Sequence, residues 1–433
     1  MRTPDRQDGE GGRWDATARP ANPAGLGGRI ASSLIRFPNY RRLWISNLFF
    51  FAGLWTQTLV LGWLVFDITR SELSVALFTA ARLTPLMLGP LSGVISDRFD
   101  RVRLLLIAAG WAFCTMSVIA TLVSLGVITY WGLVVGGFCI GMAQSPSQPA
   151  RYALVSELVE RDSLSNANAL NSIVMNMTQI IGPALGGAMI AAFGPAVALW
   201  VSAFWYLFSF LALWRLRGIG RASARHADET LLASLTGGMK AVFSSRLASA
   251  VLLTTLLSNI LIWPIQAAFM PVFAKVHLGL DAEGLGWLLT STGIGGLIGS
   301  LTIAALGDFR FKGGIFLVGT ACCGLLWAAF ALSTWLPLSF VIIAVMGMCS
   351  APFVVMQTTL LLMMTEPRVQ GRVMGLQELT IGIMPLATII LGAAAQRYGV
   401  AMVALVDGVL LAALIVILAI RVPELLRYSG RPA

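Results

Sequence analysis

The stretch Gly93-Val-Ile-Ser-Asp97-Arg98-Phe-Asp-Arg101-Val-Arg103 separates two long apolar runs of the chain. It lies where one predicted membrane span ends and the next begins. Gly93 permits close approach of neighbouring helices, as small residues do in membranes. Asp97 can interact with the positive amino end of a nearby helix. The stretch therefore predicts a tight, charged turn between two packed helices.

Apolar residues dominate the chain on both sides of this turn. Of 433 residues, 57% are hydrophobic and 12% charged, and the mean hydropathy is +0.81. These values indicate an integral membrane protein. A helix needs roughly 20 apolar residues to cross a bilayer, so twelve spans take about 240 residues. We predict spans at residues 43–66, 74–96, 103–126, 130–149, 168–192, 196–215, 248–272, 284–306, 314–333, 337–362, 374–395 and 401–421.

The basic residues are distributed unevenly around these spans. With the amino terminus in the cytosol, all but four of the 30 Lys and Arg residues fall on the cytoplasmic side. Arg70, Lys275 and Arg397 fall outside, and Arg82 lies within a span. This positive-inside bias predicts a protein of the inner (cytoplasmic) membrane with both termini cytoplasmic. Topology thus explains the net charge of +10, and we expect no nucleic-acid partner.

Polar segments divide the chain into parts. The amino-terminal arm has no apolar run that would make a signal peptide, and we expect it to be disordered in the cytosol. Between Asp228 and Phe243 the apolar spacing fits an amphipathic surface helix and a solvated linker helix equally well. The predicted parts are an arm at 1–35, a six-helix bundle at 36–216, a linker at 217–246, a second six-helix bundle at 247–421 and a cytosolic tail at 422–433.

The two halves resemble each other. Shifted by 211 residues, Leu73–Asp97 lies without gaps over Gly284–Asp308. The second and eighth spans then coincide in length, and both end at an acidic residue followed by basic ones. This repetition predicts an all-α membrane protein with twelve transmembrane helices in two six-helix pseudo-repeats.

The charged turn resembles the signature loop of the major facilitator superfamily, G-x-x-x-D-R-x-x-R-R. The resemblance implies the fold of that superfamily. It also implies a latch that holds the cytoplasmic side closed against the eleventh helix, which begins near Arg372. The copy at residues 307–312 is degenerate and does not predict a second latch. The residues that we assign to the latch are Gly93, Asp97, Arg98, Arg101 and Arg103.

A second motif lies in the fifth span. Gly182-Pro183-Ala-Leu-Gly186-Gly187 resembles the end of a motif associated with antiporters of this superfamily, although Thr178 stands where an upstream glycine is expected. The resemblance favours export; the alternative is a proline kink beside a small-residue packing face. Further stretches at 151–159, 166–170 and 371–376 resemble the subgroup of the enterobactin exporter and macrolide-efflux proteins. That subgroup implies proton-driven export of amphipathic small molecules, such as siderophores or drugs.

In this superfamily the first, fourth, seventh and tenth helices line the cavity. The resemblance therefore implies that polar and aromatic side chains in these spans contact the substrate. Buried amides can instead tie helices together. The candidates are Gln57, Thr58, Gln144, Asn259, Gln266 and Gln357, with Trp55, Trp263 and Phe353 as aromatic surface.

Ionisable residues inside spans are costly, which makes Arg82, Glu378 and Asp407 candidates for proton coupling. Arg82 stays protonated and would pair with a carboxylate or an anionic substrate. Of the two carboxylates we favour Glu378, because Asp407 lies on the usually peripheral twelfth helix. An ion pair with Arg82 or with the Asp97 turn is the structural alternative for Glu378.

The sequence indicates a secondary transporter rather than an enzyme. It lacks a cluster of nucleophiles, metal ligands or paired acids, its five cysteines have no C-x-x-C spacing, and it contains no phosphate-binding loop for ATP. We expect no metal and no cofactor. The expected partners are the lipid bilayer, a small-molecule substrate and the proton as coupling ion, and we expect a monomer. An importer of the same superfamily and a sensor that keeps this fold without transport remain the rival interpretations.

Overall fold

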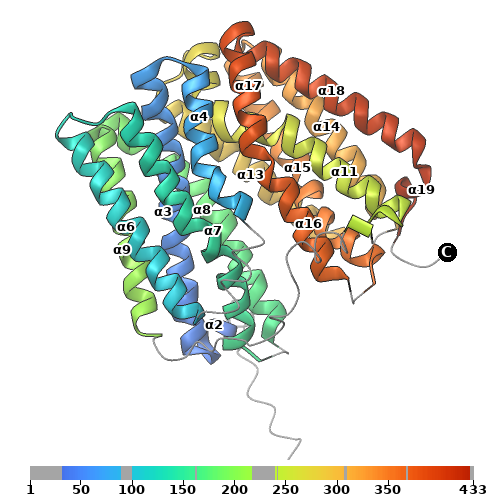
Figure 1. Cartoon of the computed structure of the whole chain (residues 1–433), viewed down its shortest axis with the longest axis horizontal. Helices are drawn as coiled ribbons and strands as arrows, with labels where there is room; N and C mark the ends of the chain where they lie inside the picture. The colour runs from blue at the N-terminus through green and yellow to red at the C-terminus, as the bar shows by residue number, and fades with distance from the viewer. Residues whose placement is uncertain are drawn as a thin grey trace, which may run out of the picture.

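The computed structural model describes residues 32–88, 100–160, 163–216, 239–240, 242–306, 310–366 and 369–429, and helices make up nearly all of this part (Figure 1). The long helices of the first half are α3 (Pro38–Thr69), α4 (Glu72–Leu83), α6 (Arg101–Ser124), α7 (Tyr130–Leu158), α8 (Leu164–Phe193) and α9 (Pro195–Trp214). Those of the second half are α11 (Arg246–Leu261), α13 (Ala282–Leu306), α14 (Lys312–Leu332), α15 (Leu336–Met364), α17 (Met384–Tyr398) and α18 (Val400–Arg421). The short elements are α2 (Ser32–Arg36), η1 (Thr84–Leu88), η3 (Ile265–Phe269), α12 (Met270–Val272), η4 (Phe273–His277), α16 (Gln370–Gly382) and α19 (Pro423–Leu426).

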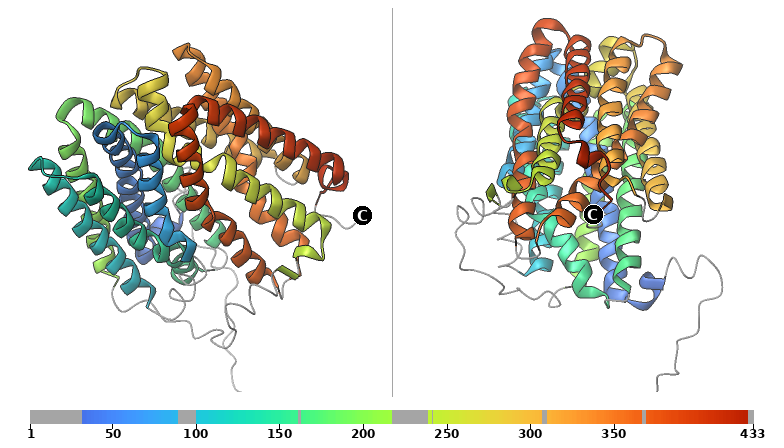
Figure 2. Two further views of the ribbon diagram at one scale, coloured as in Figure 1. Left: turned by 45° about the horizontal axis from the view of Figure 1, so that its top comes forward. Right: turned by 90° about the vertical axis from the view of Figure 1, so that its right-hand side faces the viewer.

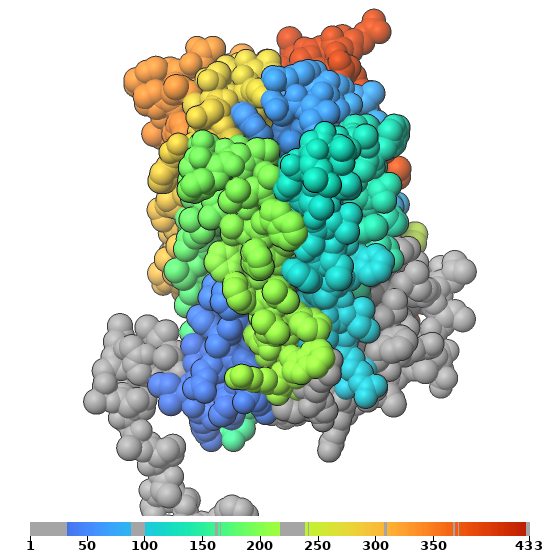
Figure 3. Space-filling view, turned by 90° about the vertical axis from the view of Figure 1, so that its left-hand side faces the viewer, coloured from blue at the N-terminus to red at the C-terminus, as the bar shows by residue number. Residues whose placement is uncertain are grey.

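Every predicted span overlaps one of these helical segments. Ten described helices are long and apolar enough to cross a membrane. Of the other two predicted spans, the one at residues 74–96 is described only to Leu88, over α4 and η1. The other is α7, which is 29 residues long but carries polar side chains from Gln144 to Arg151. Figure 3 shows the face formed by α6 and α9. Large apolar side chains of these two helices are exposed, among them Ile107 at 68% and Phe208 at 44%, as expected of surface in contact with lipid.

Helix α7 is longer than its predicted span, which ended at residue 149. It continues to Leu158 and places Arg151, counted above with a cytoplasmic loop, inside the first bundle at 1% exposure. The guanidinium lies 3.9 Å from the centre of the Phe50 ring and donates to Asn47 Oδ1 at 2.5 Å. The ring and the amide stabilise the buried charge, so the helix does not have to end before it.

The polar segments are described only in part. Residues 32–35 of the predicted arm belong to α2, which packs on α8 and is held by an Arg36–Glu160 ion pair of 2.7 Å. The remainder of the arm and most of the segment from Asp228 to Phe243 lie outside the described residues, so neither interpretation of that segment is tested.

Prolines interrupt two of the helical segments of the second half. In the segment from Arg246 to His277, Pro264 precedes the π-helical turn η3 and Pro271 lies in α12, before the second π-helical turn. Proline lacks the amide hydrogen that an α-helix needs, so the ladder of hydrogen bonds shifts there. Pro385 similarly follows the break between α16 and α17.

The chain forms two helical bundles side by side (Figure 2). We call the end at which α3 begins, where α18 also ends, the termini end, and the opposite end the far end. Helices α8 and α13 join the halves: Gly286 and Gly293 of α13 lie against α8, and Thr290 Oγ1 donates to Ile180 O at 2.9 Å.

Toward the termini end this junction opens. Further along the face of α13 that carries Gly286 and Gly293, Ala304 is exposed, and on the matching face of α8 Ile173 is 41% exposed. The two bundles are thus packed together at the far end and separate toward the termini end.

Candidate substrate cavity

A cavity of about 250 Å³ lies between the two halves. Apolar and aromatic side chains make up most of its wall, and side chains of both bundles contribute. The first half supplies Leu54, Trp55, Thr58, Leu59, Gly62, Phe78, Thr79, Arg82, Gln144, Gln179 and Pro183, and the second Trp263, Gln266, Ala267, Met270, Pro271, Leu289 and Thr292.

Among the described residues that line this wall, Arg82 is the only one with a charged side chain. It comes from α4 and is 8% exposed. Its NH1 donates to Thr58 Oγ1 at 2.6 Å, and the same hydroxyl donates to Leu54 O at 2.7 Å, one turn earlier on α3. The buried Nε of Arg82 has no hydrogen-bond partner among the described residues. Thr58 thus fixes the guanidinium at the wall without neutralising it.

The other polar groups of the wall are amides and hydroxyls. Gln144, Gln179 and Gln266 come from α7, α8 and η3, and the side-chain amide of Gln144 faces the Tyr206 hydroxyl. Such groups can donate or accept, so they suit ligands with varied polar substituents.

The structure brings some of the predicted cavity residues together and places others elsewhere. Thr58, Gln144, Trp263, Gln266 and also Trp55 line the cavity. The remaining candidates are Gln57, which is fully buried with neither amide atom paired among the described residues, Asn259, which donates to Thr380 Oγ1 at 3.3 Å, and Gln357, whose Oε1 is likewise unpaired.

The tenth helix contributes nothing to the wall in this conformation. Phe353 of α15 lies 5.8 Å from Trp263 and 5.9 Å from Phe316, measured between ring centres. Trp263 lines the cavity, and Phe353 packs against it without reaching the wall. The second, fifth and eighth helices contribute instead, with Thr79, Gln179 and Thr292.

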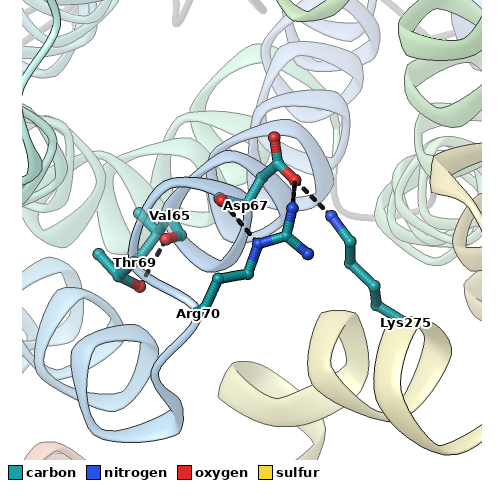
Figure 4. Close-up of polar contacts among 5 residues, drawn as sticks. All are labelled: Val65, Asp67, Thr69, Arg70 and Lys275. Carbon is teal, nitrogen blue, oxygen red and sulfur yellow. Dashed lines mark hydrogen bonds and ion pairs between the residues drawn. The ribbon is translucent and has the colours of Figure 1, made fainter.

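An ion pair joins the halves at the far end (Figure 4). Asp67, near the end of α3, accepts from Lys275 Nζ of η4 and from Arg70 NH2 at 3.0 Å. Arg70 has a left-handed backbone, with φ of 51°, and its Nε also donates to Asp67 O at 3.0 Å. Lys275 Nζ lies 4.6 Å from the centre of the Trp63 ring. The sharp turn after α3 and the bridge to the second half therefore share one carboxylate.

A neutral contact closes the far end beside this ion pair. Gln396 of α17 accepts from Ser71 Oγ at 2.8 Å and from Leu73 N at 3.4 Å. Ser71 is the N-cap of α4, so the amide of one half completes the cap of the other.

The glycine motif of α8 serves two interfaces. A Cβ on Gly182 would lie 2.6 Å from Trp55 Cβ, and one on Gly186 would lie 3.4 Å from Thr56 O, so both glycines face α3 within the first half. Gly187 faces the second half, where a Cβ would lie 3.1 Å from Gly286 Cα. Pro183 lines the cavity between them. The motif therefore packs helices and also joins the two bundles.

The predicted latch lies partly outside the described residues, namely Gly93, Asp97 and Arg98. Arg101, at the start of α6, is paired with Glu157 of α7, a contact within the first half. Arg103 lies 3.8 Å from Asp100, whose carboxylate accepts from the first amides of α6. The described part of the turn thus caps α6 and ties it to α7.

Neither titratable candidate for proton coupling lines the cavity. Glu378 lies on α16 with an exposed side chain, and it has no ion pair with Arg82 or with any other described residue. Asp407 is 7% exposed on α18, and its Oδ2 has no hydrogen-bond partner in the described part of the chain.

The sequence is similar to a family of membrane proteins. The family described as transmembrane secretion effector matches residues 31–429. The multidrug efflux pump Tap of Mycolicibacterium fortuitum is 26% identical over 351 residues, which cover 78% of this chain and 84% of Tap. The enterobactin exporter EntS of Shigella flexneri is 28% identical over 307 residues, which cover 70% of this chain and 71% of EntS.

Solved structures share the fold. A mutant of the nucleoside transporter NupG superposes with a TM-score of 0.72 at 15% identity, covering 88% of this chain and 99% of NupG. A bacterial homologue of the human lysosomal transporter Spinster, in an inward-facing and unoccupied conformation, gives 0.70 at 12% identity, covering 92% and 99% of the two chains. At these identities the likeness concerns the fold alone, and it confirms the predicted all-α membrane fold.

Proposed function

The chain belongs to the transmembrane secretion effector family of major facilitator transporters, and from this premise we propose that it exports amphipathic small molecules in exchange for protons. Members of this superfamily are secondary transporters and not enzymes, so that prediction is confirmed. The observation that carries the proposal is the cavity: it lies between two bundles that separate toward one end only, and its wall is apolar with a few polar groups. This wall suits a molecule with an apolar body and polar substituents.

The arrangement supports alternating access. Three contacts close the far end: the Asp67–Lys275 ion pair, the hydrogen bonds between Gln396 of α17 and the start of α4, and the packing of the glycines of α8 and α13. Export requires these contacts to break while the termini end closes. The positive-inside bias supports a cytoplasmic location of the termini end, in the inner membrane. The similarity to proteins named as a drug efflux pump and an enterobactin exporter supports the direction of transport.

Everted membrane vesicles test this function. Vesicles that contain the protein and are energised by respiration are expected to accumulate amphipathic dyes and siderophores, and a protonophore should stop that accumulation. Vesicles without the protein give the background. Accumulation only in right-side-out vesicles would instead establish an importer, and saturable binding without flux would establish a sensor.

The far-end ion pair gives a prediction about the equilibrium between the two conformations. In Lys275→Glu the new carboxylate would face Asp67, so the far end should open more often. Partly exposed pairs contribute up to about 1 kcal/mol, which corresponds to about fivefold in the equilibrium. We expect a cysteine introduced at Thr79, in the cavity wall, to react about fivefold faster with an impermeant maleimide added from the far side.

The charge-reversed double variant is the matched control. Asp67→Lys combined with Lys275→Glu, in a chain that also carries Arg70→Gln so that the new lysine does not face Arg70, restores opposite charges between the halves and should return the labelling rate toward that of the parent. Labelling that stays fast in the double variant would show that the ion pair does not hold the far end closed.

A further inference from the structure

Arg82 is a buried cation that lines the cavity and has no counter-ion among the described residues. We propose that it makes the cavity selective for anionic amphipathic molecules, which have an aromatic or apolar body and a carboxylate or a similar anionic oxygen group. The proposal rests on the transport function above, because it names the substrate class of that cavity. It starts from the contrast between Arg82 and the other buried cations.

Among the described residues, the other buried cations lie outside the cavity wall, and each is bonded or paired within the protein. Arg151 is covered by the Phe50 ring and bonded to Asn47, Arg101 is paired with Glu157, and Lys312 donates to Ser429 O at 2.9 Å. Arg82 lines the cavity, donates to the Thr58 hydroxyl and interacts electrostatically with Tyr206, and no carboxylate lies within ion-pair distance of it among the described residues. A charge at membrane depth without a counter-ion is costly, so such a residue indicates a functional site.

The charge of the wall determines which ligands it favours. In the part of the wall that the structure describes, the lining residues include one arginine and no aspartate or glutamate. In a medium of low dielectric constant a cationic ligand would be repelled by Arg82, and a neutral ligand would leave it unpaired. A carboxylate can accept two parallel hydrogen bonds from the planar guanidinium, the strongest arrangement available to it.

The guanidinium is held in place before a ligand arrives. NH1 is bonded to Thr58, which in turn is bonded to α3, so the group does not need to be ordered on binding. Trp55 from the first half and Trp263 from the second add flat apolar surface to the same wall. A ligand bonded to Arg82 would therefore contact both bundles. The volume of about 250 Å³ is slightly below the roughly 300–1,000 Å³ of typical ligand sites, which favours a body of one or two rings in this conformation.

Binding of three matched probes to the purified full-length protein tests the proposal. The probes are 2-naphthoate, its neutral amide and 2-naphthylmethylammonium, measured by equilibrium dialysis at neutral pH. We expect naphthoate to bind at least tenfold more tightly than the amide and the ammonium probe to bind most weakly. Arg82→Gln should reduce the preference for naphthoate over the amide to about onefold. Arg82→Lys, which keeps the charge but loses the planar fork, should retain part of it.

Several outcomes would overturn the proposal. They are equal binding of naphthoate and the amide by the parent protein, no binding of naphthoate at millimolar concentration, and an unchanged preference in Arg82→Gln. If Arg82→Gln does not yield a monodisperse protein, the parent and Arg82→Lys measurements still decide. Transport separates this proposal from the proposed function: selective binding without proton-dependent flux refutes export alone, whereas export of all three probes at equal rates refutes anion selectivity alone.

Discussion

Alanine in place of Gly286 is expected to reduce transport by one to two orders of magnitude. A Cβ at this position would lie 2.7 Å from the carbonyl oxygen of Pro183, a backbone atom of the other half that cannot rotate away. Overpacking of this kind costs typically 1–3 kcal/mol, which corresponds to roughly 5-fold to 150-fold in a conformational equilibrium. The cost falls on the conformation that is closed at the far end. The variant should therefore rarely open its cavity toward the termini end.

Gly296, on the same helix, provides the matched control. The nearest atom to a Cβ there is the carbonyl oxygen of Gly347 at 3.8 Å, an ordinary contact. Gly296→Ala should transport at the rate of the parent in vesicles that contain equal amounts of protein. If both alanine variants transport alike, close packing of α8 on α13 does not limit the cycle. If Gly286→Ala alone fails to accumulate in the membrane, the contact serves folding rather than conformational change.

The spans could be predicted from the sequence because each depends on local composition. A run of about 20 apolar residues crosses a bilayer whatever the rest of the chain does. The exception, α7, shows the limit of this rule. Its continuation to Leu158 depends on Phe50 and Asn47, which lie about a hundred residues earlier in the chain and cover Arg151. No local pattern reveals such a partner.

The cavity wall was predicted less completely for a related reason. The resemblance directed attention to four helices, but which helices reach the cavity depends on the conformation and on aromatic packing. Gln179 could have been found from its position one turn before Pro183, in a motif already identified. The bridge from Asp67 to Lys275 could not, because it joins residues that come together only when the two bundles meet.

Glu378→Gln is expected to abolish proton-driven export while leaving the protein folded. A coupling carboxylate must exchange its proton with the aqueous side that is open. Glu378 is exposed on α16, which precedes α17 in the chain. Helix α16 lies toward the termini end, where the two bundles separate (Figure 1). The glutamine variant cannot carry the proton, so energised vesicles should accumulate no substrate. Passive exchange of substrate down its own gradient should persist, because the packing of the bundles is unchanged.

Asp407→Asn is the control that distinguishes the two carboxylates. Asp407 is buried on α18 beside Gly408, which packs so closely on α14 that a Cβ there would lie 2.9 Å from Ala328 N. That packing gives the Asp407 carboxylate little access to water, and its Oδ2 lacks a hydrogen-bond partner among the described residues. We expect Asp407→Asn to keep proton-driven export. The reverse result would be loss of proton-driven export in Asp407→Asn and its persistence in Glu378→Gln. That result would assign proton coupling to the twelfth helix and would require water to reach Asp407 during the transport cycle.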